Sequence, residues 1–368
     1  MARPTAETPR VPHHPPLVLG IETSCDDTAC AVLDGEGRVL ASVVSSQLAA
    51  HRPYGGVVPE IASREHLANW PRVSGEALAA AGIRLGDIGD IGAVAATRGP
   101  GLVGALLVGL SLGKAIAFAL ERPFHAVHHL EGHLYSPFLA PPGEELPADP
   151  VPDRFTGLVV SGGHTSLFAV EDGTVETLGE TRDDAMGEIF DKVGKRLGLP
   201  YPQGPRVDEL AEQGDATARR FPTPLRGGTL DFSYSGLKSQ ALLEIEKLER
   251  TLGPIDLGSS GEPVPAPVLD LLAGFRAAAV AQLVDRLNRL HERRPISFLA
   301  VSGGVAANRL LRRELPAWAD RHGVTLRLVP LAYAGDNAAM IAHAALLRQR
   351  RGQSDDPFAA EAESRIAL

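Results

Sequence analysis

Two histidines four residues apart, His129 and His133, are the residues in this sequence best suited to bind a metal ion. Four residues of α-helix turn through about 400°, so both imidazoles would lie on one helix face within reach of one ion. Four histidines fall between positions 125 and 133, and this density favours a metal site over a helix face that is only polar. We therefore predict a two-histidine metal clamp, with a polar helix face as the alternative.

A third metal ligand and a general base have to come from other side chains. Asp336 lies in a turn before a predicted helix, where it either completes a His-His-Asp ligand set or only caps the helix. Glu131 follows His129 by two residues and so lies on nearly the opposite helix face. In an H-E-x-x-H metalloprotease the base directly follows the first histidine. The spacing of Glu131 therefore argues against a zinc protease.

Small polar turns after predicted strands supply the other candidate site residues. A hairpin over residues 17–33 presents Asp26 and Asp27 at its tip, and a second hairpin over residues 156–173 presents Ser-Gly-Gly-His-Thr at 161–165. A third Ser-Gly-Gly turn, at 302–304, lies between a strand and a helix, as in many nucleotide-binding sites. Glycines in such turns let backbone N–H groups approach a phosphate or acyl ligand. The alternative for each turn is a plain connection that binds no ligand.

These turns need strands and helices to hold them, and the predicted elements alternate between strand and helix, which indicates an α/β fold. The pattern of residues 17–37 recurs at 156–173, so we expect two like-folded domains whose hairpin tips face one cleft. We divide the chain into a disordered tail (1–16), an N-terminal domain (17–140) whose final helix returns from the C-terminal end, a C-terminal domain with inserted helices (154–345) and a flexible tail (346–368).

Proline and glycine set the expected helix boundaries. Pro71 divides one region into predicted helices over about residues 59–70 and 73–81. The apolar run at 102–120 is almost long enough to cross a bilayer, but it contains Lys114 and three glycines. We therefore expect a closely packed helix there and no membrane span.

Composition excludes several classes of protein. The 368 residues are 44% hydrophobic, enough for two globular domains, and the first sixteen residues contain no apolar run that would form a signal peptide. A net charge of −9 predicts no extensive basic surface, so any RNA contact must be local or shared with a partner. Arg309, Arg312 and Arg313 are candidates for it, with a solvated helix face as the alternative. The two cysteines are expected to be free thiols, which fits the cytoplasm.

Eight motifs occur together and in one order, and through them the sequence resembles the bacterial TsaD family of tRNA N6-adenosine threonylcarbamoyltransferases. They span most of the chain: GIETSCDDT (20–28), GPGL (99–102), HHLEGH (128–133), VSGGHT (160–165), EIFDK (188–192), FSYSGLK (232–238), SGGVAAN (302–308) and GDN (335–337).

The resemblance implies an actin-like ATPase fold, with two related domains facing a central cleft. It also implies transfer of the L-threonylcarbamoyl group from threonylcarbamoyl-adenylate to N6 of adenosine 37, in tRNAs that read codons beginning with A. The expected partners are the tRNA, the paralogue TsaB and the ATPase TsaE, with the separate synthase TsaC supplying the adenylate.

The same resemblance implies one divalent metal ion, Fe²⁺ or else Zn²⁺, held by His129, His133 and Asp336. The residues expected to bind the adenylate or an ATP-type nucleotide are Val159, Val160, Ser161, Gly162, Gly163, Asp191, Gly204, Asp208 and Asn308. For Asp191 the alternative is a solvated helix face. Asp26 or Asp27 is our candidate for orienting or deprotonating the attacking amine, with a role only in the turn as the alternative.

The competing functions are a sugar or acetate kinase, a secreted metallopeptidase and a non-catalytic nucleotide-binding scaffold.

Overall fold

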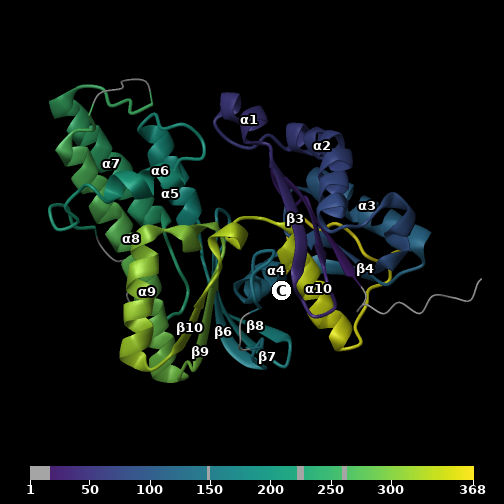
Figure 1. Ribbon diagram of the computed structural model, residues 1–368. Coiled ribbons are helices and arrows are strands. Elements are labelled where there is room, and N and C mark those ends of the chain that lie inside the picture. The colour runs from purple at the N-terminus through teal and green to yellow at the C-terminus, as the bar shows by residue number, and fades with distance from the viewer. Residues whose placement is uncertain (1–16, 147–149, 222–227, 259–262) are drawn as a thin grey trace, which may run out of the picture.

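The computed structural model describes residues 17–146, 150–221, 228–258 and 263–368, which form two halves, each built on a five-stranded sheet (Figure 1). The predicted disordered tail falls on residues 1–16 and lies outside the described residues.

The first sheet has the strand order β3-β2-β1-β4-β5. β1 pairs antiparallel with β2 and parallel with β4, so a hairpin continues into a parallel layer. The strands are β1 (Leu17–Glu22), β2 (Asp27–Leu33), β3 (Val39–Ser46), β4 (Ile91–Gly99) and β5 (Phe124–His128).

The second sheet repeats this plan, in the order β8-β7-β6-β9-β10. β6 pairs antiparallel with β7 and parallel with β9, as β1 does with β2 and β4. The strands are β6 (Arg154–Val160), β7 (Thr165–Glu171), β8 (Thr174–Glu180), β9 (Phe298–Ser302) and β10 (Thr325–Leu328). The matching topology confirms the internal repeat that the two hairpin patterns predicted.

Helices cover both faces of the first sheet. α2 (Pro59–Ala80) and α3 (Val103–Leu120) pack on one face, and α10 (Ala338–Arg350) packs on the other. Gly20 in β1 lies so close to α10 that a Cβ atom there would overlap the Ala338 carbonyl oxygen. The short helix α1 (Leu48–His51) and the 3₁₀ turns η1 (Arg52–Tyr54) and η2 (Leu85–Asp90) complete this half.

The second half carries its own helical layer beside the sheet (Figure 1). α5 (Met186–Arg196), α6 (Gly204–Ala211), α7 (Ser235–Leu252) and α8 (Ala266–Arg293) pack on one another, and α9 (Arg309–His322) packs against β10. α4 (His129–Tyr135) lies between the halves, in contact with β5, β6 and α10. The remaining 3₁₀ turns are η3 (Ser136–Phe138), η4 (Gly304–Ala307) and η5 (Leu331–Tyr333).

α2 differs from its prediction, because it continues as one helix through Pro71. The ring of Pro71 is exposed, whereas Val73 and Ala77 beyond it are buried against the sheet. The carbonyl that loses its helical donor at Pro71 belongs to residue 67, whose side chain is 60% exposed, so it lies on the solvent side of the helix. Burial of the second part of the helix therefore outweighs the local cost of the proline.

The C-terminal residues also differ from their prediction, because 346–368 are not a flexible tail. Residues 346–350 finish α10, and the chain then runs along the first half. Asp355 N–H donates to the Phe124 carbonyl (3.0 Å), Glu363 N–H donates to the Arg98 carbonyl (2.8 Å), and Ala360 is buried in the core of this half. These backbone contacts hold in place a segment that we predicted to be a flexible tail.

In the part of the chain that the structure describes, two helices, α3 and α8, are long and apolar enough to span a membrane by length and composition alone. α8 is mostly buried among the other helices of the second half. α3 packs one face against β4 and α2, as predicted for a packed helix, and exposes apolar side chains on its other face.

Candidate metal centre

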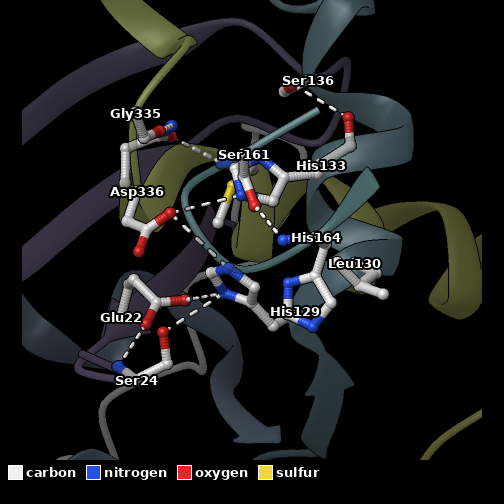
Figure 2. A network of polar contacts seen from close by, with 12 residues as sticks. Glu22, Ser24, His129, Leu130, His133, Ser136, Ser161, His164, Gly335 and Asp336 are labelled. Atoms are coloured by element: carbon white, nitrogen blue, oxygen red, sulfur yellow. Dashed lines mark hydrogen bonds and ion pairs between the residues drawn. The ribbon is translucent and has the colours of Figure 1, made fainter. Parts of the chain in front are cut away.

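α4 presents His129 and His133 together (Figure 2). β5 leads directly into this helix, and His128 starts it, since its Nδ1 accepts a hydrogen bond from the Leu130 N–H (3.1 Å). The two imidazole rings of His129 and His133 meet edge to face, with centroids 4.7 Å apart. The helix predicted around the pair is confirmed.

Asp336 joins the two histidines from the segment just before α10 (Figure 2). Its Oδ1 lies 3.5 Å from His129 Nε2 and 3.2 Å from His133 Nε2, and the three potential ligand atoms lie within 4.8 Å of one another. Asn337, rather than Asp336, caps α10, because its Oδ1 accepts the Met340 N–H (2.9 Å). The Asp336 carboxylate is therefore available to a metal ion.

Glu22 and Ser24 hold His129 through its other ring nitrogen. His129 Nδ1 lies 3.2 Å from Glu22 Oε2 and 3.3 Å from Ser24 Oγ. Thr97 Oγ1 donates to the same Glu22 oxygen (2.6 Å). A carboxylate behind a ligating imidazole fixes the orientation of its ring. Burial disfavours the charged form of His129, but the Asp336 and Glu22 carboxylates outweigh it and raise the pKa of His129 to about 9.

The donor set fits a divalent transition metal. Both ring nitrogens of His133 are buried, and apart from the ion-pair contact of Nε2 with Asp336 neither has a polar partner among the described residues. Burial opposes ionisation of Asp336, yet the two histidines hold the pKa of its carboxyl well below the usual range. Two imidazoles and one carboxylate suit iron, zinc or manganese and leave coordination positions for water or a ligand.

Glu131 points away from this centre, as its spacing predicted. Both of its carboxylate oxygens accept hydrogen bonds from the Arg348 guanidinium, at 3.0 and 2.6 Å. Glu131 therefore does not lie next to the metal ligands, where a metalloprotease has its catalytic base. This position argues against the peptidase alternative.

A cavity of about 660 Å³ opens over the metal ligands, between the two halves. Both hairpin tips line it, so the predicted facing of the tips is confirmed for Asp26 and for the turn at 161–164. Asp27 does not line this cavity; it begins β2, where burial and the Asp336 and Asp26 carboxylates raise its pKa to about 7. Of the two candidate bases, only Asp26 faces the cavity.

Two hydrogen bonds cross the mouth of this large cavity from one half to the other. Lys195 Nζ donates to the Gly55 carbonyl (3.0 Å), and the Tyr201 hydroxyl donates to Asp26 Oδ2 (3.3 Å). All four residues line the cavity, so the contacts bridge its two sides.

A second cavity of about 340 Å³ adjoins the first and shares Gly162 and Asp191 with it. Gly204, Asp208 and Asn308 also line it, so five of the predicted nucleotide-binding residues meet here. Asp191 is not on a solvated helix face, because its Oδ1 accepts the N–H groups of Gln203 (3.0 Å) and Gly204 (2.7 Å).

Asp208 and Asn308 hold each other at the wall of the smaller cavity. Asn308 Nδ2 donates to Asp208 Oδ1 (2.7 Å), while Asn308 Oδ1 accepts the Leu311 N–H and so caps α9. Arg276 donates to the same Asp208 oxygen (3.0 Å). The Ser-Gly-Gly turn predicted between a strand at 296–301 and a helix at 309–315 therefore leads into one wall of this cavity, which residues of the 304–309 segment line.

Val159 and Val160 line neither cavity, contrary to their predicted role. β6 lies in the middle of the second sheet, between β7 and β9, and both valine side chains are fully buried there. The turn that follows is partly occupied as well, because Ser161 N–H donates to the His164 carbonyl (2.7 Å). The N–H groups of Gly162 and Gly163 have no protein partner among the described residues, and a Cβ atom on either glycine would enter open space.

Two of the three arginines suggested for RNA contact, Arg312 and Arg313, are engaged within the protein. Arg312 donates to the carbonyls of Ala306 (3.2 Å) and Val329 (3.3 Å), and Arg313 pairs with Glu212 (2.6 Å). Arg309, at the start of α9, is exposed, so it remains the candidate for RNA contact in this group.

Several site residues were not predicted from sequence. Glu22 lies behind His129, Tyr201 and Lys195 reach across the mouth of the large cavity, and Ser364 of the C-terminal segment lines that cavity. Glu22 is a charged residue inside an apolar strand, and that signal was available in the sequence.

Together the fold and the site define a two-domain protein of the actin-like ATPase fold with a possible metal-binding triad, two histidines and one aspartate, in its cleft. Among solved structures, component A of (R)-2-hydroxyglutaryl-CoA dehydratase from Acidaminococcus fermentans matches with a TM-score of 0.52 at 16% identity, over 92% of this chain and 99% of that one. HypF from T. kodakarensis matches with a TM-score of 0.58 at 14% identity, over 92% of this chain and 48% of that one. These likenesses show the fold, and the predicted fold class is confirmed.

The TsaD family model, described as tRNA N6-adenosine threonylcarbamoyltransferase, matches residues 38–343. A protein of that name from Pelobacter propionicus is 51% identical over 328 residues, covering 89% of this chain and 90% of the relative. Another from Burkholderia mallei is 48% identical over 340 residues, covering 92% and 94%. The chain belongs to the TsaD family, and the family inferred from the eight motifs is confirmed.

Proposed function

We propose that this enzyme transfers the L-threonylcarbamoyl group from threonylcarbamoyl-adenylate to N6 of adenosine 37 of tRNA, at the centre formed by His129, His133 and Asp336. Membership of the TsaD family supports the reaction. The observation that carries the site is the convergence of three potential metal ligands at the floor of a cavity that is joined to a second one.

We propose one divalent ion per chain, Fe²⁺ in preference to Zn²⁺, held by these three side chains. The nitrogen and oxygen donors suit both ions, and the preference for iron rests on the resemblance. When bound, the ion supplies Lewis acidity at an oxygen of the acyl group or phosphate, which makes the acyl carbon more electrophilic.

We place the nucleoside of the adenylate in the smaller cavity and its acyl group in the larger one. Asp191 and Asp208 line the smaller cavity as acceptors suited to hydroxyl groups, and Gly162 lies where the two cavities meet. The free N–H groups of Gly162 and Gly163 are suited to donate to phosphate or acyl oxygens at that junction. An adenylate in this pose directs its acyl carbon toward Asp336.

Transfer then forms a bond from N6 of adenosine to the acyl carbon and breaks the bond from that carbon to the phosphate oxygen, with AMP as the leaving group. The amine loses one proton in this step. Asp26 faces the cavity and is hydrogen-bonded to the Tyr201 hydroxyl, so we propose that it orients the amine and accepts the proton. Asp27, behind it, supports the turn.

We propose that the anticodon loop of the tRNA docks at the lip formed by η1. Tyr54 there is 60% exposed, Arg52 beside it is exposed with no ion-pair partner among the described residues, and the adjoining Gly55 lines the large cavity. Aromatic and basic side chains of this kind stack on and attract unpaired nucleotides. Replacing Tyr54 with Ala should raise the KM for tRNA roughly tenfold and leave metal content unchanged.

The paralogue TsaB is proposed to bind the exposed apolar face of α2 and α3. Leu67, Val103 and Leu107 are each 47–60% exposed on these adjacent helices. TsaE and TsaC are proposed as further partners on the strength of the resemblance alone. Two cysteines without a disulfide fit a reaction in the cytoplasm, which we also propose.

A reconstituted reaction tests the proposal. The enzyme is mixed with TsaB, TsaE, ATP, labelled threonylcarbamoyl-adenylate and unmodified tRNA, and the nucleosides are analysed. Label should appear in modified adenosine with the wild-type enzyme and disappear with the double variant His129→Ala/His133→Ala. If the wild-type enzyme binds nucleotide but transfers no label, the result would contradict the proposal and favour a kinase or a non-catalytic scaffold.

A further inference from the structure

Glu131 and Arg348 form a buried, two-pronged ion pair behind the metal centre. Arg348 Nε donates to Glu131 Oε1 (3.0 Å) and Nη2 donates to Oε2 (2.6 Å), with the Glu131 side chain 7% exposed. The third nitrogen, Nη1, donates to the Ala126 carbonyl (3.1 Å) and lies 3.3 Å from Asp355. The guanidinium thereby joins α4, the strand before it and the C-terminal segment. Neither residue has a role in the proposed reaction.

This ion pair connects the two elements that carry all three potential metal ligands. His129 and His133 belong to α4, and Asp336 immediately precedes the cap of α10. Glu131 therefore projects from the ligand-bearing helix on the side away from the metal, and Arg348 projects from the helix that begins at the third ligand.

A second contact fixes the same two helices nearer to Asp336. Gly132 packs so closely on α10 that a Cβ atom would lie 2.9 Å from Ile341 Cδ1 and 3.0 Å from Met340 Cγ. The helices thus touch at Gly132, and the ion pair acts further along α10, eight residues beyond Met340. A third contact joins them at the end of α4, where His343 Nδ1 lies 3.3 Å from the Tyr135 carbonyl oxygen. Of these three contacts the two-pronged ion pair has the most defined orientation, so it opposes rotation of α4 about its own axis most directly.

Small rotations matter here because the ligand atoms lie far from the helix axis. An imidazole nitrogen about 6 Å from the axis moves by about 1 Å when the helix turns by about 10°. Metal–ligand distances tolerate changes of only about 0.2 Å. A modest loosening of α4 is therefore enough to spoil the geometry of the centre without unfolding the protein.

We propose that Glu131 and Arg348 are positioning residues for the metal centre: their ion pair sets the rotation of α4 against α10, so that His129 and His133 meet Asp336. The inference rests on the metal centre proposed above. It gives the glutamate of the HHLEGH motif a role at a distance from the reacting atoms.

The test compares Glu131→Gln with a matched control, Glu249→Gln. Glu249 forms a similar two-pronged pair with Arg196, between α5 and α7 in the other half of the molecule. Binding of Co²⁺ to the chelator-treated full chain is titrated by visible absorption, and thermal unfolding is recorded for each protein. Arg348→Lys, which keeps the charge but loses the fork, serves as a second variant with a smaller change in the core.

Glu131→Gln should weaken Co²⁺ binding about 10- to 100-fold and alter the absorption of the bound ion, as loss of an orienting contact commonly does. Glu249→Gln should bind Co²⁺ within about twofold of the wild type, even if both variants lose similar thermal stability. Arg348→Lys should fall between them. Wild-type affinity in Glu131→Gln, or in Arg348→Lys if the first variant does not fold, would overturn the inference. Failure of the wild type itself to bind Co²⁺ would instead overturn the metal centre on which the inference rests.

Discussion

The imidazole of His129 lies between two carboxylates, Glu22 and Asp336, and a metal ion must displace the proton that they hold there. Below its pKa of about 9, His129 in the metal-free protein is protonated, so metal affinity should rise with pH up to that value. Displacement of one proton predicts about a tenfold lower Kd for each pH unit, for example from about pH 7 to about pH 8. Zn²⁺ titration against a competing chelator of known pH dependence measures this slope.

Glu22→Gln provides the control for the pH dependence, because it removes one of the two carboxylates that raise the pKa of His129. The variant should show a shallower slope between about pH 7 and pH 8. A wild-type Kd that does not change over this interval would contradict the protonation state assigned to His129.

The histidine pair was predictable because its geometry is local, set by four residues of one helix. The residue types left the role of Asp336 open between metal ligand and N-cap, since aspartate and asparagine are equally good N-caps, and the resemblance favoured the ligand. The structure shows that the Asn337 side chain caps α10. Glu22 was missed because its contact with His129 joins residues 107 positions apart. Site residues brought together by tertiary structure leave little trace in a single sequence.

The turn from β9 into η4 forms one wall of the smaller cavity and depends on Gly303. Gly303 has φ +90°, and a Cβ atom there would overlap the Val160 carbonyl oxygen. Gly303→Ala should therefore lower the free energy of unfolding by about 2 kcal/mol or more, from backbone strain and the clash with β6. Urea unfolding measures the loss.

Gly304→Ala is the matched control for this turn, because no atom lies within 4 Å of the position that its Cβ would take. Its free energy of unfolding should stay within about 0.5 kcal/mol of the wild type. Equal stability of the two variants would show that the turn is not held as closely against β6 as described.

At the level of helices and strands, periodicity predicted most elements, including both hairpins and α3, but failed where packing opposed a local signal. Pro71 marks a helix end by every local rule, yet α2 continues because Val73 and Ala77 have an apolar surface to bury. The valines at 159 and 160 show the reverse problem. They border the Ser-Gly-Gly turn at 161–163 in sequence, but strand geometry turns their side chains into the core.

For the molecule as a whole, the exposed apolar face of α3 predicts where a partner binds. Leu107→Glu should weaken the complex with TsaB more than tenfold, because it places a charge in an apolar interface. Light scattering of mixed TsaB and enzyme measures the complex. Leu243→Glu is the control, since Leu243 is similarly exposed (56%, against 49% for Leu107) but lies on α7 in the other half.

Unchanged TsaB affinity in Leu107→Glu, or an equal loss in Leu243→Glu, would contradict the assignment of the interface to α3.

The two-fold repeat of the sheet was predictable at this scale because each half carries its own hairpin pattern. The course of the C-terminal segment was not predictable. Its backbone hydrogen bonds to residues 98 and 124 do not depend on the side chains of the segment, so its sequence does not indicate them.

The most direct measurement of the central claim is transfer activity as a function of metal content. The enzyme is stripped with a chelator, and threonylcarbamoyl transfer to tRNA is followed while Fe²⁺ is added back without oxygen, with Zn²⁺ in parallel. Activity should be lost on stripping and return in proportion to bound metal, up to one ion per chain, and Asp336→Asn should need far more metal. Full transfer by metal-free enzyme would contradict a metal centre at His129, His133 and Asp336.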